Sequence, residues 1–168
     1  MTISASIYAG ARVRQTGALD LGTPAVEIDT GRKNFDFVDG VTAGKADRVF
    51  SDRRTLAASA SENLDLAGGL TDAFGAALTF AKVVALVVRA ADANASDIVL
   101  GGAASNAFVG PFGAATHTIA VKPGGAMVLV APKGGWAVTA ATGDLLKVLN
   151  GSGAASADYD ILVLGTSA

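Results

Sequence analysis

The amino-acid sequence predicts an all-β protein, an antiparallel β-sandwich with a jelly-roll-like strand arrangement and an N-terminal β-rich or extended segment. From Thr79 to Gly165, short apolar runs alternate with glycine-rich turns, a spacing typical of antiparallel sandwiches and small barrels. Hydrophobic residues make up 51% of the chain, aromatic residues only 6%, and 21 residues are glycine. The core is therefore expected to consist of small aliphatic side chains, and 168 residues are enough for one such core with an appended arm.

The first part of the chain, residues 1–46, is more polar and less regular than the rest. We expect short strands at Ile3–Tyr8 and Ala25–Asp29, followed by a polar linking region over Thr30–Ala46. Residues 1–46 are interpreted as an arm that lies across a neighbour or as strands added to the sheets. Residues 47–168 are interpreted as the β-sandwich domain.

The segment after residue 46 begins with a further strand over Arg48–Ala58 and a connector from Ser61 to Phe74. Asn63–Leu66 alternates like a strand, and Thr71 is predicted to cap a single helical turn that Gly75 ends. The run Thr79–Arg89 is almost continuously apolar, which predicts a central strand buried on both faces by a covering sheet.

The remaining strands are predicted from short apolar runs and the turns between them. The runs are Asp97–Leu100, His117–Val121, Ala126–Val130, Trp136–Thr139, Leu145–Leu149 and Asp160–Leu164. Lys122–Gly125 and Pro132–Gly135 each place a proline before two glycines, as tight turns require. Asn150-Gly151 predicts a β-hairpin turn.

Composition excludes several classes of function. The chain has no cysteine, which excludes disulfides, a thiolate nucleophile and a cysteine-bound metal. Its net charge of −2 argues against nucleic-acid binding. The apolar run Val83–Val88 is bounded by Lys82 and Arg89 and falls short of the roughly 20 residues of a membrane span. The N-terminal residues of the sequence lack the features of a Sec signal peptide. Together with the absence of cysteine, this leads us to expect folding in a reducing cytoplasm. We expect no membrane partner.

Few residues are suited to catalysis or to metal binding. His117 is the only histidine, and no serine has a nucleophile elbow around it. Asp158 and Asp160 would share a strand face, with Asp144 as a candidate neighbour, as in an acid–base pair or a calcium site. No calcium-loop or phosphate-loop motif accompanies them. We therefore predict no catalytic, metal or cofactor residue, no cofactor and no enzymatic activity.

Two groups of residues are candidates for binding. Arg48, Arg53 and Arg54 are interleaved with aspartates, and they form either a solvated strand edge or a docking face for an acidic partner. Trp136 is the only tryptophan. It either packs in the sandwich or stacks on a sugar ring, with Tyr159 and Phe112 as candidate additions to the platform.

The segment Asp47–Gly113, which includes ADRVFSDRRTLAASASENLDLAGGLTDAFG and DIVLGGAASNAFVGPFG, resembles small virion proteins of tailed bacteriophages. The KPGG turn, the GGWAVT run and the closing DILVLGTSA share this resemblance, which covers about the last two thirds of the chain. It implies a β-sandwich that decorates the capsid or belongs to the tail, and it carries over no active-site residue.

The expected function is therefore that of a capsid decoration (cement) protein. Such a protein would be made in the host cytoplasm and would then be located in the virion. It would bind the major capsid protein as a homotrimer on the outer surface of the head and stabilise contacts between capsomers. The alternative is a tail-fibre or receptor-binding module that recognises a host surface glycan through Trp136.

Overall fold

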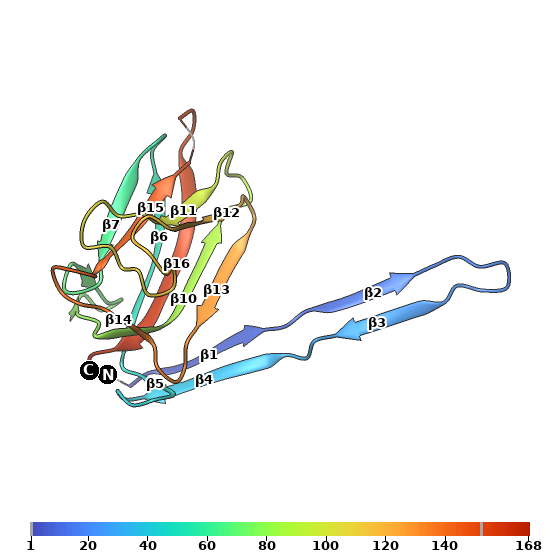
Figure 1. Cartoon of the computed structure of the whole chain (residues 1–168), viewed down its shortest axis with the longest axis horizontal. Coiled ribbons are helices and arrows are strands. Elements are labelled where there is room, and N and C mark those ends of the chain that lie inside the picture. Colours follow the sequence, from blue (N-terminus) through green and yellow to red (C-terminus); the bar gives the residue numbers. More distant parts are fainter. Residues whose placement is uncertain (1, 152) are drawn as a thin grey trace.

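The computed structural model describes residues 2–151 and 153–168, and within these residues the chain forms strands and no helix. Two antiparallel sheets lie face to face (Figure 1). The first contains, in spatial order, β13 (Ala126–Val130), β10 (Lys82–Ala90), β16 (Ala157–Thr166) and β6 (Arg48–Leu56), and β14 (Trp136–Ala137) also pairs with β10. The second contains β12 (Thr118–Val121), β11 (Ile98–Gly101), β15 (Leu145–Asn150) and β7 (Ser61–Asp65). The predicted all-β sandwich is confirmed, whereas the jelly-roll arrangement stays a prediction.

The main core lies between the two sheets and consists mostly of aliphatic side chains. Strand β10 contributes Val83, Leu86 and Val88, all fully buried. The second sheet contributes the alternate residues of β11 and β15, including Ile98 and Leu146. Because successive side chains of a strand point to opposite faces, regular strands give every second residue to this core, and in β10 a register shift between Val83 and Ala85 breaks the alternation once.

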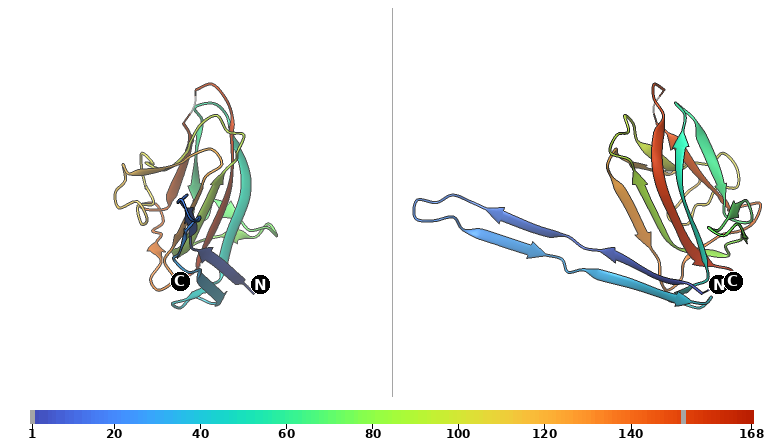
Figure 2. Two further views of the ribbon diagram at one scale, coloured as in Figure 1. Left: turned by 90° about the vertical axis from the view of Figure 1, so that its right-hand side faces the viewer. Right: turned by 180° about the vertical axis from the view of Figure 1, so that it is seen from behind.

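The N-terminal part forms a long two-stranded ribbon that leaves the foot of the sandwich, close to both ends of the chain (Figures 1 and 2). Its base is β1 (Ser4–Ala9) paired with β4 (Lys33–Asp39), and its outer half is β2 (Arg12–Thr16) paired with β3 (Ala25–Asp29). The short β5 (Lys45–Ala46) pairs with the end of β4 in parallel. We call residues 4–39 the arm.

The predicted polar linking region Thr30–Ala46 is wrong, because it contains β4 and β5. Strand β4 alternates: Phe37 is buried and Phe35 half-buried, while Asn34 and Asp36 are exposed. The polar residues on the solvent side of β4 led to the prediction of a polar link, although polar and apolar residues alternate there as in a strand. Strand β2 was missed as well, because its five residues are all exposed and most are polar.

The base of the arm packs on the outer face of the five-stranded sheet and forms a second core. Phe37 of the arm and Ile3, which precedes the arm, form one cluster with Val84, Ala85 and Leu164 of the sheet. The predicted burial of the β10 run on both faces is confirmed. One face is covered by the second sheet and the other by the arm.

Two local predictions are corrected by the structure. The helical turn after Thr71 is absent: Asp72 accepts hydrogen bonds from the amides of Phe74 and Ala76 and forms the tight turn between β8 (Leu70–Thr71) and β9 (Ala77–Leu78). Asn150-Gly151 is not a hairpin turn, because β15 and β16 belong to different sheets. Asn150 is buried, and its amide nitrogen donates to backbone oxygens that include those of Ala57 and Ala155.

Candidate docking surface

The outer half of the arm is an amphipathic ribbon with an uncovered apolar face. In its register Val13 lies opposite Ile28, and Val26 lies two pairs further towards the tip, opposite Gln15. Side chains of paired residues point to the same face of an antiparallel ribbon. Val13, Val26 and Ile28 therefore share one face, and they are 54%, 59% and 56% exposed.

The opposite face of the ribbon is charged and suited to water. Arg12 lies within 2.8 Å of a carboxylate oxygen of Glu27, and Arg14 lies 3.8 Å from the other oxygen. These pairs are exposed and add little stability. Both faces of the ribbon are exposed, one charged and one apolar.

The tip of the arm is a tight turn that presents two leucines. The amide and carbonyl groups of Leu19 and Gly22 bond to each other across the turn, which leaves Asp20 and Leu21 at the end. Leu19 is 71% exposed and Leu21 is fully exposed. The tip lies about 40 Å beyond Gly10, from roughly a dozen residues at about 3.3 Å each.

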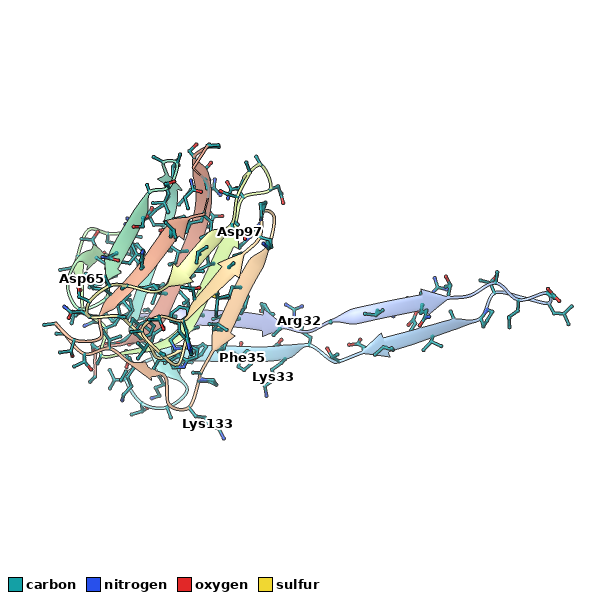
Figure 3. The ribbon with its side chains drawn as sticks, turned by 45° about the horizontal axis from the view of Figure 1, so that its top comes forward. Arg32, Lys33, Phe35, Asp65, Asp97 and Lys133 are labelled. Carbon is teal, nitrogen blue, oxygen red and sulfur yellow. The ribbon has the colours of Figure 1, made fainter. Side chains whose placement is uncertain are left out.

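A bend at two glycines separates the base of the arm from its outer half. A Cβ atom on Gly10 would lie 2.5 Å from the carbonyl oxygen of Gly31, and Gly31 has a φ of +72°. Beyond this point no side chain of the arm belongs to either hydrophobic core. Figure 3 shows where the arm leaves the sandwich: Phe35 lies beside the sandwich, whereas Lys33 and then Arg32 lie farther out towards the bend.

The outer face of the five-stranded sheet carries a partly uncovered apolar area next to the arm, at whose border Leu162 packs against the second core. The row Val130, Ala85, Leu164 and Val49 belongs to the core beneath the base of the arm. The next row along the same strands contains Val128, Val87 and Leu162, and these three are partly exposed. A hollow of about 520 Å³ begins at Val87 and Leu162 and continues to Arg53, Arg89 and Asp160.

The three arginines predicted as one docking face do not share a face. Arg53 lies on the outer face of β6, where its guanidinium donates to Asp160 at 2.6 Å. Arg48 and Arg54 occupy alternate positions with the buried Phe50, on the opposite side. The hydrogen bond between Arg53 and Asp160 raises the pKa of the arginine and lowers the pKa of the carboxyl.

Arg48 and Arg54 both have partners within the chain. Arg48 pairs with Asp47 at 3.1 Å. Arg54 pairs with Asp52 and with Glu62, and Glu62 also accepts a hydrogen bond of 2.7 Å from the hydroxyl of Tyr159. Since β6 and β16 belong to one sheet and β7 to the other, this network joins the two sheets at one edge of the sandwich.

Trp136 packs against the main core and is only partly exposed. The chain passes so close to it that a Cβ atom on Gly110 would lie 2.4 Å from the Cβ of Trp136. Phe112 also packs on the core, and Tyr159 is 1% exposed. Tyr159 is therefore unable to contribute to a sugar-stacking platform.

The residues considered for catalysis are not brought together. His117 is exposed, and its Nδ1 lies 2.9 Å from the carbonyl oxygen of Phe112. Asp160 pairs with Arg53, and Asp158 accepts a hydrogen bond from Thr55. Asp144 precedes β15 in the other sheet and accepts a hydrogen bond from the amide of Ala141. Among the described residues no group of three or more acidic, histidine or cysteine side chains is placed to hold a metal.

An arm was one of two interpretations of residues 1–46, but sequence reasoning did not identify the apolar face of its outer half. Its signal was present in the alternation of Arg12–Thr16 and Ala25–Asp29, where apolar and charged residues take turns. Only the pairing of the two segments shows that their apolar residues fall on one face.

In the described part of the chain no helix is long and apolar enough to span a membrane. No protein-family model, curated protein or solved structure matches this chain, so its family is not assigned by similarity.

Proposed function

We propose that this protein is a non-enzymatic structural subunit that uses its arm to assemble into a multi-copy particle, as a capsid decoration protein does. The observation that carries the proposal is the uncovered apolar face of the arm, formed by Val13, Val26 and Ile28, together with the two leucines of the tip. An isolated two-stranded ribbon is at best marginally stable in water. A ribbon of this length with an apolar face is best explained as a surface that a partner covers.

The energy available from covering the arm is large for a feature of this size. Fully burying one valine, leucine or isoleucine side chain contributes about 1.5–3 kcal/mol. The five exposed residues are already partly screened by the ribbon, and ordering of the partner offsets part of the gain. Several kcal/mol remain, which is enough to hold a subunit in place when many copies bind the same lattice.

Capsid decoration is the form of this role that the sequence resemblance implies. In this role the sandwich would bind the outer surface of the phage head. The arm, which extends from the foot of the sandwich, would reach a neighbouring subunit. A decoration protein binds the assembled shell and thereby stabilises it by mass action. Arg48, Arg53 and Arg54 remain a prediction for the contact with the major capsid protein, and Arg53 is the one that lies on the outer sheet face.

The test is to mix the purified protein with empty heads assembled from the major capsid protein encoded in the same genome, followed by cryo-electron microscopy. Regular density on the outer surface is expected, and its symmetry would give the oligomeric state. A genome without a capsid gene, or bare heads at saturating protein, would overturn decoration. The matched variant is Val13→Ser with Ile28→Ser, which changes only exposed positions and is expected to lower occupancy.

The geometry does not favour the glycan alternative, because Trp136 packs on the core and Tyr159 is buried. A titration of tryptophan fluorescence with host polysaccharide addresses it directly. The chain has one tryptophan, so the signal has one source. A flat response is expected, and a saturable shift would favour adhesion.

A further inference from the structure

We propose that the tip of the arm docks into the outer sheet face of a second copy of this chain, where Leu19 and Leu21 cover Val87 and Leu162 and Asp20 pairs with Arg89. This inference deepens the proposed assembly role by naming the partner of the arm. It does not depend on capsid binding.

The first argument is that one chain carries both halves of an apolar contact. The tip presents two exposed leucines, and the hollow of about 520 Å³ has Val87 and Leu162 on its apolar side. Val128 extends this area towards the edge of the sheet and is 40% exposed. Two different patches on one chain that fit each other are what a heterologous contact between identical copies requires.

The second argument is charge complementarity. Both carboxylates that line the hollow already have partners, since Asp160 pairs with Arg53 and Asp52 with Arg54. Among the described residues Arg89 makes no ion pair or hydrogen bond, although it lies opposite Asp160 in the strand register and helps to lower the pKa of that carboxyl. The hollow therefore offers an apolar side and a cation whose guanidinium is free to bind a further carboxylate.

The tip has the matching character. Asp20 stands between the two leucines and has no ion pair or hydrogen bond within the described residues. An apolar turn with one free carboxylate fits an apolar hollow with one free arginine. An arginine–carboxylate contact of this kind also sets the orientation of the tip.

The third argument is that a chain cannot place its tip in its own hollow. The base of the arm is held by the second core, and the strand pairing continues through β2 and β3 to the tip. The ribbon leads away from the sandwich in Figure 1 and in the right-hand view of Figure 2. The contact must therefore join different copies.

A contact between the tip of one copy and the sheet of the next is heterologous. Such contacts close into a ring when the rotation between copies allows it. A ring of three would match the homotrimer predicted from the sequence resemblance, and its sandwiches would remain free to face a larger assembly.

Engineered cysteines test the contact directly, because the natural chain has none. Two single variants, Leu21→Cys and Leu162→Cys, are purified separately, mixed and oxidised. A disulfide between the two variants is expected, since the proposed contact brings these positions together and a disulfide needs Cβ atoms about 3.5–4.5 Å apart. Phe74→Cys is the matched control, because Phe74 is 84% exposed in another part of the sandwich. The proposal would be overturned if Leu21→Cys formed a disulfide with Phe74→Cys in the same yield as with Leu162→Cys.

A charge swap gives an independent readout by sedimentation. The wild-type chain is expected to form a defined oligomer, and Asp20→Arg or Arg89→Asp alone should weaken it about 10-fold or more. The double variant should recover most of the loss, whereas Lys133→Asp, at an exposed turn outside the hollow, should change nothing. A monomeric wild-type chain at every concentration, or an absence of recovery in the double variant, would refute the contact. Bare heads in the capsid experiment with intact crosslinking would instead leave this contact standing and overturn only decoration.

Discussion

Removing the hydroxyl of Tyr159 tests the polar link that joins the two sheets at one edge of the sandwich. Tyr159 is 1% exposed on β16, and its hydroxyl donates a 2.7 Å hydrogen bond to Glu62 on β7. Glu62 is also paired with Arg54 on β6, which lies opposite Tyr159 in the sheet register. The variant Tyr159→Phe removes this one bond and keeps the aromatic ring in the core.

The size of the effect follows from the charge of the acceptor. A hydrogen bond to a charged group contributes about 1.5–3 kcal/mol to stability. The carboxylate of Glu62 keeps Arg54 as a partner in the variant, so the lower part of this range applies. We expect the free energy of unfolding to fall by about 1.5–2 kcal/mol, which for a chain of this length lowers the Tm by about 3–8 °C.

The assay is denaturant unfolding of the wild-type chain beside Tyr159→Phe and Tyr8→Phe. Tyr8 is 48% exposed, so Tyr8→Phe makes the same chemical change at a surface position. Surface substitutions usually change stability by less than about 0.5 kcal/mol. Equal losses in the two variants would refute the idea that the hydroxyl of Tyr159 stabilises the fold through Glu62.

The same residue predicts the response to alkaline pH. Burial, and then the hydrogen bond to Glu62, raise the pKa of Tyr159 above its ordinary value of about 10. A group whose pKa is raised by folding contributes stability that is complete below the unfolded pKa and lost as pH rises above it. The wild-type chain should therefore lose stability above about pH 10, and Tyr159→Phe should lack this contribution. In a Tyr8→Phe background, ultraviolet absorbance should show no tyrosine ionisation until the chain unfolds.

Three further substitutions have expected outcomes that unfolding experiments can check. Asn150→Ala removes the amide that bonds to backbone oxygens near the edge of both sheets and should cost about 2–4 kcal/mol; a loss below 1 kcal/mol would contradict a structural role. Gly165→Ala places a Cβ atom 2.2 Å from a backbone oxygen of β10 and should cost about 3 kcal/mol or more, whereas Gly22→Ala, with no atom within 4 Å, should be nearly neutral. Arg53→Gln removes the partner that holds the pKa of Asp160 low. A carboxyl group whose pKa is lowered by folding stabilises the fold above its unfolded pKa of about 4, and this stabilisation is lost as pH falls further. The difference in the free energy of unfolding between Arg53→Gln and wild type should therefore shrink as pH falls below about 4.

Apolar periodicity was sufficient to predict most strands of the sandwich. Ala126–Val130 agrees with the observed β13 at both ends, and the apolar run before Arg89 became the buried β10. These segments carry their own signal, because a buried strand must present apolar residues on the face or faces that it buries. The all-β class and the small-residue core follow from them.

Turn chemistry was less reliable, because one motif fits several local structures. Lys122–Gly125 does form a tight turn, with the amide of Gly125 bonded to the carbonyl of Lys122, but it joins strands of different sheets. Asp72, not Thr71, organises its loop, and it does so as a turn rather than as a helix cap. Local sequence specifies where the chain bends but not which sheet receives the next strand.

The sequence by itself determined the fold class, the core composition and the near absence of groups for catalysis, because these depend on residue types and on spacing along one segment. Only the tertiary structure decided how the polar and charged residues are used. It paired two polar segments into an arm, gave Arg53 and Arg54 their separate partners Asp160 and Glu62, and buried Tyr159 and Asn150 as polar links. The physical reason is that a polar side chain acquires its role from the partner it meets. Those partners are distant in sequence, as Arg53 and Asp160 are, and no local pattern encodes them.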